Sequence, residues 1–116
     1  MIIKNPLEVP AVDVEMEGAQ DVKVRVVLGP ADDAPTFAMR IFELAPSGHT
    51  PYHAHPFEHE VVMLSGDIDI VTPAGDRPMQ VGDVALIAPG DTHQFKNRST
   101  EAPASFMCLV PIAYQS

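Results

Sequence analysis

The sequence contains few basic residues and a single cysteine. Sixteen aspartate and glutamate residues stand against seven lysine and arginine residues, which gives a formal net charge of -9 at pH 7. This charge repels nucleic acids and anionic membranes, so we expect neither as a partner. One cysteine cannot form an internal disulfide, and Cys108 therefore fits a reducing compartment.

The chain also lacks a long hydrophobic run. No apolar stretch approaches the roughly 20 residues that a membrane-spanning helix needs. The first residues do not have the basic-then-apolar profile of a signal peptide. We therefore expect a soluble protein of the cytoplasm.

Stretches in which a long helix could form are scarce, because twelve prolines and seven glycines interrupt the chain. The longest stretch free of both, residues 91–102, has no apolar period of 3.6 residues. We therefore predict an all-β fold. A chain of 116 residues is expected to form one domain. Residues 1–20 are expected to be an N-terminal arm or edge strand, and residues 21–116 a single barrel domain.

Short runs of alternating or β-branched residues, bounded by glycine and proline, predict the strands. They lie at residues 22–28, 36–44, 68–70, 83–87, 92–97 and 104–110, and a further strand within residues 53–66 carries histidines. Turns are expected at residues 30–35, 46–48, 65–67 and 89–91, and a hairpin loop at residues 73–78. About eight or nine short strands indicate a sandwich or barrel, in which closure protects the edges.

Three of the five histidines lie between residues 53 and 66. Side chains alternate between the two faces of a strand, so His53 and His55 are expected to point the same way, and His59 shares their parity. Converging imidazoles repel each other when protonated and lack partners when buried alone. A divalent metal ion removes both problems, so the pattern predicts a metal site.

A different metal site is also compatible with part of this stretch. Residues 55–59 match the His-x-x-Glu-His pattern of inverted zinc peptidases. That pattern places its histidines on one face of a helix, whereas Pro56 interrupts a helix and the two valines after Glu60 favour a strand. The sequence therefore favours histidine ligands on a strand.

A second stretch, residues 82–97, completes a resemblance to the cupin superfamily. The paired motifs of that family are G-x5-H-x-H-x3,4-E-x6-G and G-x5-P-x-G-x2-H-x3-N. The residues that match the first motif are Gly48, His53, His55, His59 and Gly66. Those that match the second are Gly82, Gly90, His93 and Asn97. The chain departs from the motifs in the short spacing from Gly48 to His53 and in Ala88, which stands where the motif has proline.

The third departure concerns the ligand set. His59 occupies the spacing at which most cupins carry glutamate, with six residues before Gly66. Glu60 fits the longer form of the motif but leaves five residues to Gly66, and its parity places it on the opposite face. We therefore assign the ligand to His59, with Glu60 as the alternative.

More narrowly, the chain resembles small single-domain microbial cupins with four histidine ligands, often manganese proteins. The resemblance is carried by residues 34–40, 53–66 and 106–111. It implies a double-stranded β-helix, a jelly-roll-like barrel, and a homodimer. It also implies one divalent transition metal ion per chain, manganese first and iron next, with nickel, copper and zinc as alternatives. The implied ligands are His53, His55, His59 and His93.

The resemblance leaves two classes of function. One is a metal-dependent oxidoreductase, dioxygenase-like, that acts on a small organic substrate. The other is a non-catalytic cupin that binds or senses a metal or small ligand, and a cupin isomerase or decarboxylase is a third, weaker interpretation. Residues expected to border the substrate pocket are Arg40, Thr50, Phe106 and Cys108. Asn97 is expected to fix a turn or the backbone.

Overall fold

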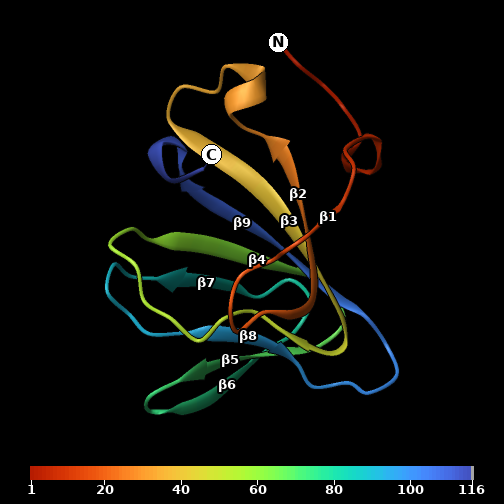
Figure 1. Ribbon diagram of the computed structural model, residues 1–116, viewed down its shortest axis with the longest axis vertical. Coiled ribbons are helices and arrows are strands. Elements are labelled where there is room, and N and C mark those ends of the chain that lie inside the picture. Colours follow the sequence, from red (N-terminus) through yellow and green to blue (C-terminus); the bar gives the residue numbers. More distant parts are fainter. Residues whose placement is uncertain (116) are drawn as a thin grey trace.

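The computed structural model describes residues 1–115, which form nine antiparallel strands and three single-turn 3-10 helices (Figure 1). The strands are β1 (Val12–Asp13), β2 (Gln20–Leu28), β3 (Phe37–His49), β4 (His59–Ser65), β5 (Ile68–Thr72), β6 (Gly75–Met79), β7 (Val84–Ile87), β8 (Gln94–Asn97) and β9 (Ala104–Pro111). The 3-10 helices are η1 (Pro6–Glu8), η2 (Pro30–Asp32) and η3 (Ile112–Tyr114). The predicted all-β class is confirmed.

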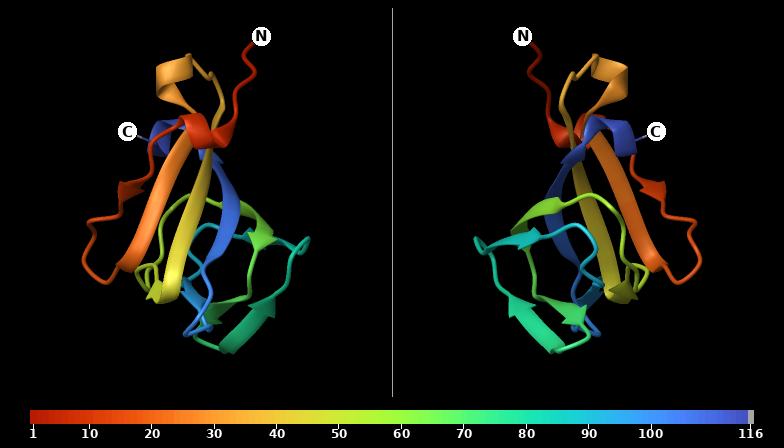
Figure 2. Two further views of the ribbon diagram at one scale, coloured as in Figure 1. Left: turned by 90° about the vertical axis from the view of Figure 1, so that its right-hand side faces the viewer. Right: turned by 90° about the vertical axis from the view of Figure 1, so that its left-hand side faces the viewer.

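The strands form one strongly bent sheet in the order β6-β5-β8-β3-β9-β4-β7, and β2 adds to β3 while β1 adds to β2. The long strand β3 links the two halves. Most of its length pairs with β2 and β9, whereas its last residue, His49, pairs with Lys96 of β8. The sheet therefore curls into a nearly closed barrel, with β5, β6 and β8 below the strands around β9 (Figure 2).

The hydrophobic core fills the inside of the barrel. Strand β9 shows how the sequence builds it, because every second residue of this strand is buried. The buried members are Ala104, Phe106, Cys108 and Val110, as the alternation of the sequence predicts for the last three. Facing side chains from β3, β4, β5 and β8 complete one cluster with them, including Leu44, Met63, Ile70 and Phe95.

The turn between β4 and β5 contains a residue that must be glycine. Gly66 has a φ of 75°, in the left-handed region that side chains rarely adopt. A Cβ atom at this position would lie 2.7 Å from the carbonyl oxygen of Pro103 and 2.9 Å from the Cα of Ala104. Gly66 therefore lets β4 end close against the start of β9, which fixes β4 and its first residue, His59.

Two expected turns differ from the structure. The hairpin predicted at residues 73–78 is present, but its turn spans only residues 73–74, because β6 begins at Gly75 and pairs with β5 along its whole length. Pro78 is accommodated because β6 lies at the end of the sheet, where a proline without an N–H group is tolerated. The turn expected at residues 46–48 is an irregularity inside β3, where Ser47 has a φ of 63°.

Three contacts tie residues 1–20 to the barrel. Strand β1 pairs with β2, Lys4 forms an ion pair with Asp32 at 2.9 Å, and the Arg25 guanidinium donates to the carbonyl oxygen of Val9. The Lys4 hydrogen bond is the main reason why the pKa of Asp32 is lowered. This arrangement places the segment after β1 beside the histidine-bearing end of the barrel. Within residues 1–115, no helix has the length and hydrophobicity needed to cross a bilayer.

Candidate metal centre

The histidines of the two motifs come from three places in the fold. His53 and His55 lie in the loop between β3 and β4, His59 is the first residue of β4, and His93 lies immediately before β8. The expectation that His53 and His55 belong to a regular strand is therefore wrong. An isolated bridge replaces the strand: the N–H of His53 donates to the carbonyl of His93 at 3.1 Å, and the reverse bond is 2.9 Å.

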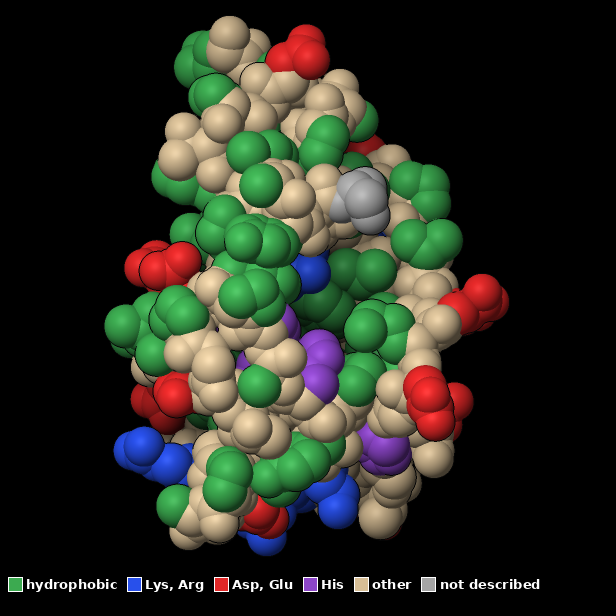
Figure 3. Space-filling view, turned by 60° about the vertical axis from the view of Figure 1, so that its left-hand side comes forward, with side chains coloured by type: hydrophobic (Ala, Val, Ile, Leu, Met, Phe, Trp, Pro, Cys, Tyr) green, Lys and Arg blue, Asp and Glu red, His purple; other side chains and the backbone are tan. Residues whose placement is uncertain are grey.

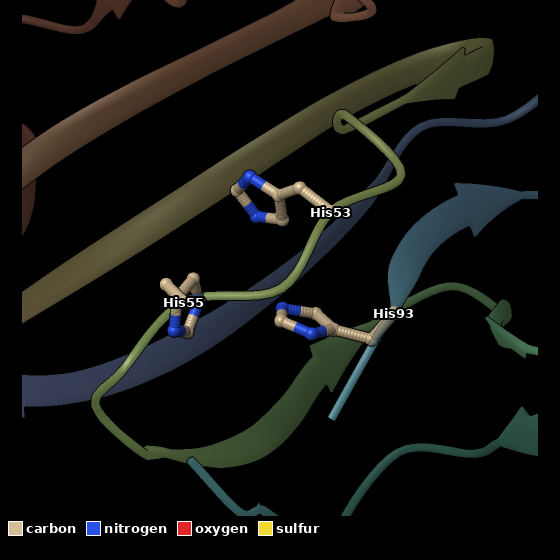
Figure 4. Close-up of side chains that lie close together, drawn as sticks. All are labelled: His53, His55 and His93. Carbon is tan, nitrogen blue, oxygen red and sulfur yellow. The ribbon is translucent and has the colours of Figure 1, made fainter. Parts of the chain in front are cut away.

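This bridge brings three imidazole rings together. Ligand atoms of His53, His55 and His93 all lie within 4.8 Å of one another, and the three rings face a common space (Figure 4). The rings of His53 and His93 have centroids 5.2 Å apart, and those of His55 and His93 are 5.0 Å apart. Three nitrogen donors at these separations can converge on a single ion.

Hydrogen bonds to the backbone set the tautomer of two of these rings. Nδ1 of His55 donates to the carbonyl oxygen of Phe57, and Nδ1 of His93 donates to that of Asp91, each at 2.8 Å. A neutral imidazole with its proton on Nδ1 has its lone pair on Nε2. Such outer hydrogen bonds are typical of metal-binding histidines because they orient the ring and the lone pair.

Burial favours the neutral form of His53, His59 and His93. It lowers the pKa of His93, although the bond to the Asp91 carbonyl opposes this shift, and it lowers the pKa of His53 together with the neighbouring rings. The pKa of His59 falls to about 2, first through burial and then through the Arg40 guanidinium. Neutral imidazoles are the form that binds a metal ion.

The residues present fit a metal ion by two further observations. Nε2 of His93 is buried and has no hydrogen-bond partner among the described residues. Nε2 of His55 lies 2.7 Å from Nε2 of His59, and two nitrogen lone pairs at this distance repel unless a proton or a cation lies beside them. A cation would satisfy all three nitrogens at once.

His59 is placed differently from the other three. It does not belong to the group of three ligand atoms within 4.8 Å, and its ring turns Nδ1 toward a small polar cluster. Sγ of Cys108 lies 3.0 Å and Nη2 of Arg40 3.3 Å from this nitrogen, and Nη2 of Arg40 also donates to Sγ at 3.2 Å. Burial raises the pKa of the Cys108 thiol, while Arg40 acts in the opposite direction.

A pocket of about 230 Å³ opens beside the histidines. The space-filling view shows a hollow in which a Lys or Arg side chain lies between hydrophobic side chains and histidines (Figure 3). Arg40 is the lysine or arginine that lines the pocket, and none of its described lining residues is aspartate or glutamate. Its aromatic walls come from β3, β8, β9, the loop before β4 and the end of the chain: Phe42, Phe57, Phe95, Phe106 and Tyr114.

The remaining predicted site residues lie either in this pocket or on the outer face of the barrel. Arg40, Phe106 and Cys108 line the pocket. Thr50 also lines it but is 7% exposed, so it is not a solvated loop residue, and its hydroxyl accepts the N–H of Phe95 at 2.9 Å. Glu60 is exposed on the outer face, opposite to the buried His59, as the predicted register requires.

The zinc peptidase pattern is excluded, because residues 55–58 form a loop and His59 begins a strand. Asn97 has the predicted backbone role. Its buried amide lies within hydrogen-bond distance of the carbonyls of Leu44, Ala45 and Ala102, and its Oδ1 accepts the N–H of Ser99. Asn97 thereby ties β8 to the end of β3 and to the start of β9.

Sequence reasoning missed seven of the described pocket residues: Val14, Met16, Phe42, Pro51, Phe57, Phe95 and Tyr114. Phe57 lies between two motif histidines, and its ring stacks on His55 with centroids 3.9 Å apart. Its position within the motif was an available signal. Tyr114 stacks on Phe57 at 4.2 Å from the far end of the chain, and nothing local in the sequence indicates this contact.

A nearly closed antiparallel barrel with histidines from two motifs at one end defines the cupin class of protein. The Cupin_2 family, described as a cupin domain, matches residues 40–110. The chain therefore belongs to the cupin domain family. None of the curated proteins compared with it shows significant similarity.

Several solved structures are similar. The polyketide cyclase RemF from Streptomyces resistomycificus is 28% identical with a TM-score of 0.91, over 97% of this chain and 80% of that one. A cupin 2 domain-containing protein from Halorhodospira halophila is 31% identical with a TM-score of 0.73, over 85% and 68%. A sugar phosphate isomerase of the cupin superfamily from Silicibacter pomeroyi is 26% identical with a TM-score of 0.70, over 78% and 59%.

Proposed function

We propose that the protein is a metal-dependent enzyme whose ion is held by His53, His55, His59 and His93. Three observations support the site: the convergence of three ligand atoms, the unpartnered Nε2 of His93, and the 2.7 Å approach of two Nε2 atoms. His59 joins as the fourth ligand when its proton lies on Nδ1, where Sγ of Cys108 at 3.0 Å accepts it. Its Nε2 lone pair is then free.

Four neutral imidazoles would leave the charge of a divalent ion uncompensated, so the centre would favour anionic ligands. Manganese and iron suit a six-coordinate site that keeps two positions open, and we propose manganese first and iron next. Nickel and copper bind nitrogen ligands more tightly, and zinc favours four ligands, so these remain the alternatives. A bound ion would polarise a substrate oxygen and offer positions for small ligands.

The chain's own residues would bind and orient the substrate. The apolar walls exclude water, which strengthens polar contacts inside the pocket. Arg40 is the charged group that would hold an anionic oxygen of the substrate, and the hydrogen bond from its Nη2 to Cys108 fixes one side of the guanidinium. Without a carboxylate among the described lining residues, the pocket offers no Asp or Glu as a general base.

The reaction that this site supports best is oxidation of a small organic molecule, in the manner of a dioxygenase. The observation that carries this proposal is the opening of the histidine nitrogens onto an apolar pocket whose described lining residues include no aspartate or glutamate. Redox chemistry at a metal ion does not need a separate general base, whereas acid–base mechanisms do, and the pocket histidines would be occupied by the ion.

A second candidate is ring closure or isomerisation. It is favoured by the similarity to the polyketide cyclase RemF, which extends over 97% of this chain, and by that to the sugar phosphate isomerase. A role as a metal or small-ligand binding or sensing protein is the non-catalytic alternative.

One experiment separates these functions. Cobalt- or iron-substituted protein is titrated with azide, and a spectral change is expected because the centre opens onto the pocket. A panel of phenols, β-diketones and small carboxylates is then incubated with and without oxygen. Oxygen uptake in step with substrate loss supports the oxidoreductase, whereas conversion without oxygen supports a cyclase or isomerase. Saturable binding without conversion supports the binding role, and a centre that does not respond to azide contradicts the oxidoreductase.

We also propose that the protein acts in the cytoplasm as a homodimer. Cys108 is free and buried, which suits a reducing compartment. Strand β7 lies at one end of the sheet path, and its Val84 and Leu86 are 77% and 67% exposed. An exposed apolar edge strand is an aggregation risk that a partner copy removes. Sedimentation of the wild type and of Leu86→Lys tests this, with dimer expected for the first and monomer for the second.

A further inference from the structure

Arg40 is held in the pocket with a buried donor, Nε, that has no partner among the described residues. The Nη2 atom donates to Sγ of Cys108 at 3.2 Å, and the guanidinium carbon lies 4.9 Å from the centroid of the Phe42 ring. A buried donor on a charged group carries a free-energy cost when it lacks a partner. An oxygen of a ligand would remove this cost.

Among the described residues, no aspartate or glutamate lines the pocket to serve this purpose. A guanidinium pairs best with a planar group that presents two oxygens or one strongly charged oxygen. The partner of Arg40 is therefore expected to be an anionic oxygen group that enters with the ligand.

The rest of the ligand is constrained by the walls. Phe42, Phe106 and Phe95 form one stack, with centroid separations of 5.1 and 4.3 Å, and the interplanar angles are 15° and 29°. His55, Phe57 and Tyr114 form a second stack, with angles of 7° and 20° between neighbouring rings. Flat aromatic walls favour a flat ligand that can stack or meet them edge to face.

The size of the pocket limits the number of rings. Its volume of about 230 Å³ lies below the range of roughly 300–1,000 Å³ that holds drug-sized ligands. A molecule of one or two rings fits this volume, whereas a larger fused system does not fit without displacement of the walls.

We propose that the pocket binds a planar aromatic molecule of one or two rings that carries one anionic oxygen group, and that Arg40 holds this group. The inference rests on the function proposed above and names its class of substrate. Arg40 then determines specificity by selecting the charged form over a neutral molecule of the same shape.

The test compares benzoate with benzamide by calorimetry on metal-loaded protein. The two probes have the same shape, and a charge-assisted hydrogen bond is worth about 1.5–3 kcal/mol, so benzoate is expected to bind about tenfold more tightly or better. In Arg40→Gln this preference should fall by about fivefold or more, to the part that the metal ion alone provides. Arg77→Gln is the matched control, because Arg77 is exposed and does not line this pocket, and it should keep the preference.

Two results would contradict the proposal that Arg40 holds the anionic group, an arrangement called here the Arg40 clamp. Equal binding of benzoate and benzamide to the wild type is one, and a benzoate preference that is undiminished in Arg40→Gln is the other, since the anion would then be held elsewhere. Should Arg40→Gln fail to fold, Arg40→Lys decides: it keeps the charge but lacks the planar fork, and its benzoate preference should fall by about threefold or more. An unchanged preference there would contradict the clamp.

Metal content, measured on the same samples, keeps this proposal separate from the metalloenzyme proposal. A preference for benzoate that depends on Arg40 in protein without metal would preserve the clamp and remove the metalloenzyme. If the protein binds metal but Arg40 does not affect the preference for benzoate, the metalloenzyme proposal stands and the Arg40 proposal is refuted. Ring number is tested with 1-naphthoate and 9-anthroate: the two-ring acid should bind at least about tenfold more tightly than the three-ring acid, and equal binding would refute the size limit.

Discussion

The backbones of His53 and His93 are joined by two hydrogen bonds, of 3.1 and 2.9 Å, although the two residues belong to different motifs. This pair fixes the distance between the loop before β4 and the start of β8, and it brings the two rings to a centroid separation of 5.2 Å. The candidate ligands are therefore held in position by the protein backbone. The arrangement does not require the ion to draw two mobile loops together.

The roles of His59 and Glu60 can be separated by substitution. His59→Gln is expected to weaken metal binding by about a hundredfold, because one of four ligands carries about a quarter of a binding free energy on the order of 10 kcal/mol. Glu60→Gln should leave the affinity and the spectrum of the metal unchanged, since Glu60 is exposed on the opposite face. A titration with manganese or cobalt measures both. If His59→Gln binds metal as tightly as the wild type, His59 is not a ligand and the site consists of three histidines.

The metal-free protein should lose stability as the pH falls below about 6.5, where histidines of the unfolded chain become protonated. The folded chain keeps His53, His59 and His93 neutral to lower pH, so the unfolded state binds more protons in this range and is favoured. For His59, the pH range over which stability is lost extends from about 6.5, the pKa in the unfolded chain, down to about 2, the pKa in the folded chain. Each such group contributes up to about 1.4 kcal/mol per pH unit to the free energy of unfolding.

Urea unfolding of EDTA-treated protein between pH 5.5 and 7.5 measures this slope, in a range above the titration of most carboxylates. His59→Gln should flatten the slope, whereas His49→Gln, which alters the histidine outside the cluster, should not. Equal slopes in the wild type and in His59→Gln would show that His59 is not kept neutral by the fold.

Gly66→Ala should be one of the most damaging alanine substitutions in the barrel. It combines an unfavourable φ with a Cβ that would lie 2.7 Å from a backbone oxygen, whereas Gly82 has a similar φ of 91° and open space around it. Backbone strain from the positive φ is expected in both Gly66→Ala and the comparison variant Gly82→Ala, and it costs on the order of 1–3 kcal/mol. The contact is specific to Gly66, so its variant should lose more stability in thermal unfolding. Equal losses would mean that β4 and β9 can separate easily at the turn.

The sequence predicts those parts of the structure that depend on alternation and on local turns. His59 is buried and Glu60 exposed because a strand has a period of two residues, and this rule does not depend on the rest of the fold. The same rule was applied to His53 and His55, which lie in a loop. Their rings converge because of the bridge to His93, a contact between distant segments that no local pattern reveals.

Edge positions and long-range contacts account for the other differences. Pro78 lies within β6, and whether a proline is tolerated in a strand depends on the place of the strand in the sheet, which the sequence alone does not give. Tyr114 reaches the pocket through η3 and stacks on Phe57. Thr50 is buried because its hydroxyl accepts a hydrogen bond from β8. Each of these features depends on how the sheet bends back on itself.

The central claim is that the histidine cluster holds one metal ion, and metal analysis of the purified protein tests it most directly. Mass spectrometry should find about one first-row divalent ion per chain in the wild type and in the control His49→Ala. Folded His93→Ala should contain almost none, because it removes the buried Nε2 that has no partner within the described residues. A wild type that cannot be loaded with manganese or iron, or full occupancy in His93→Ala, would contradict the account.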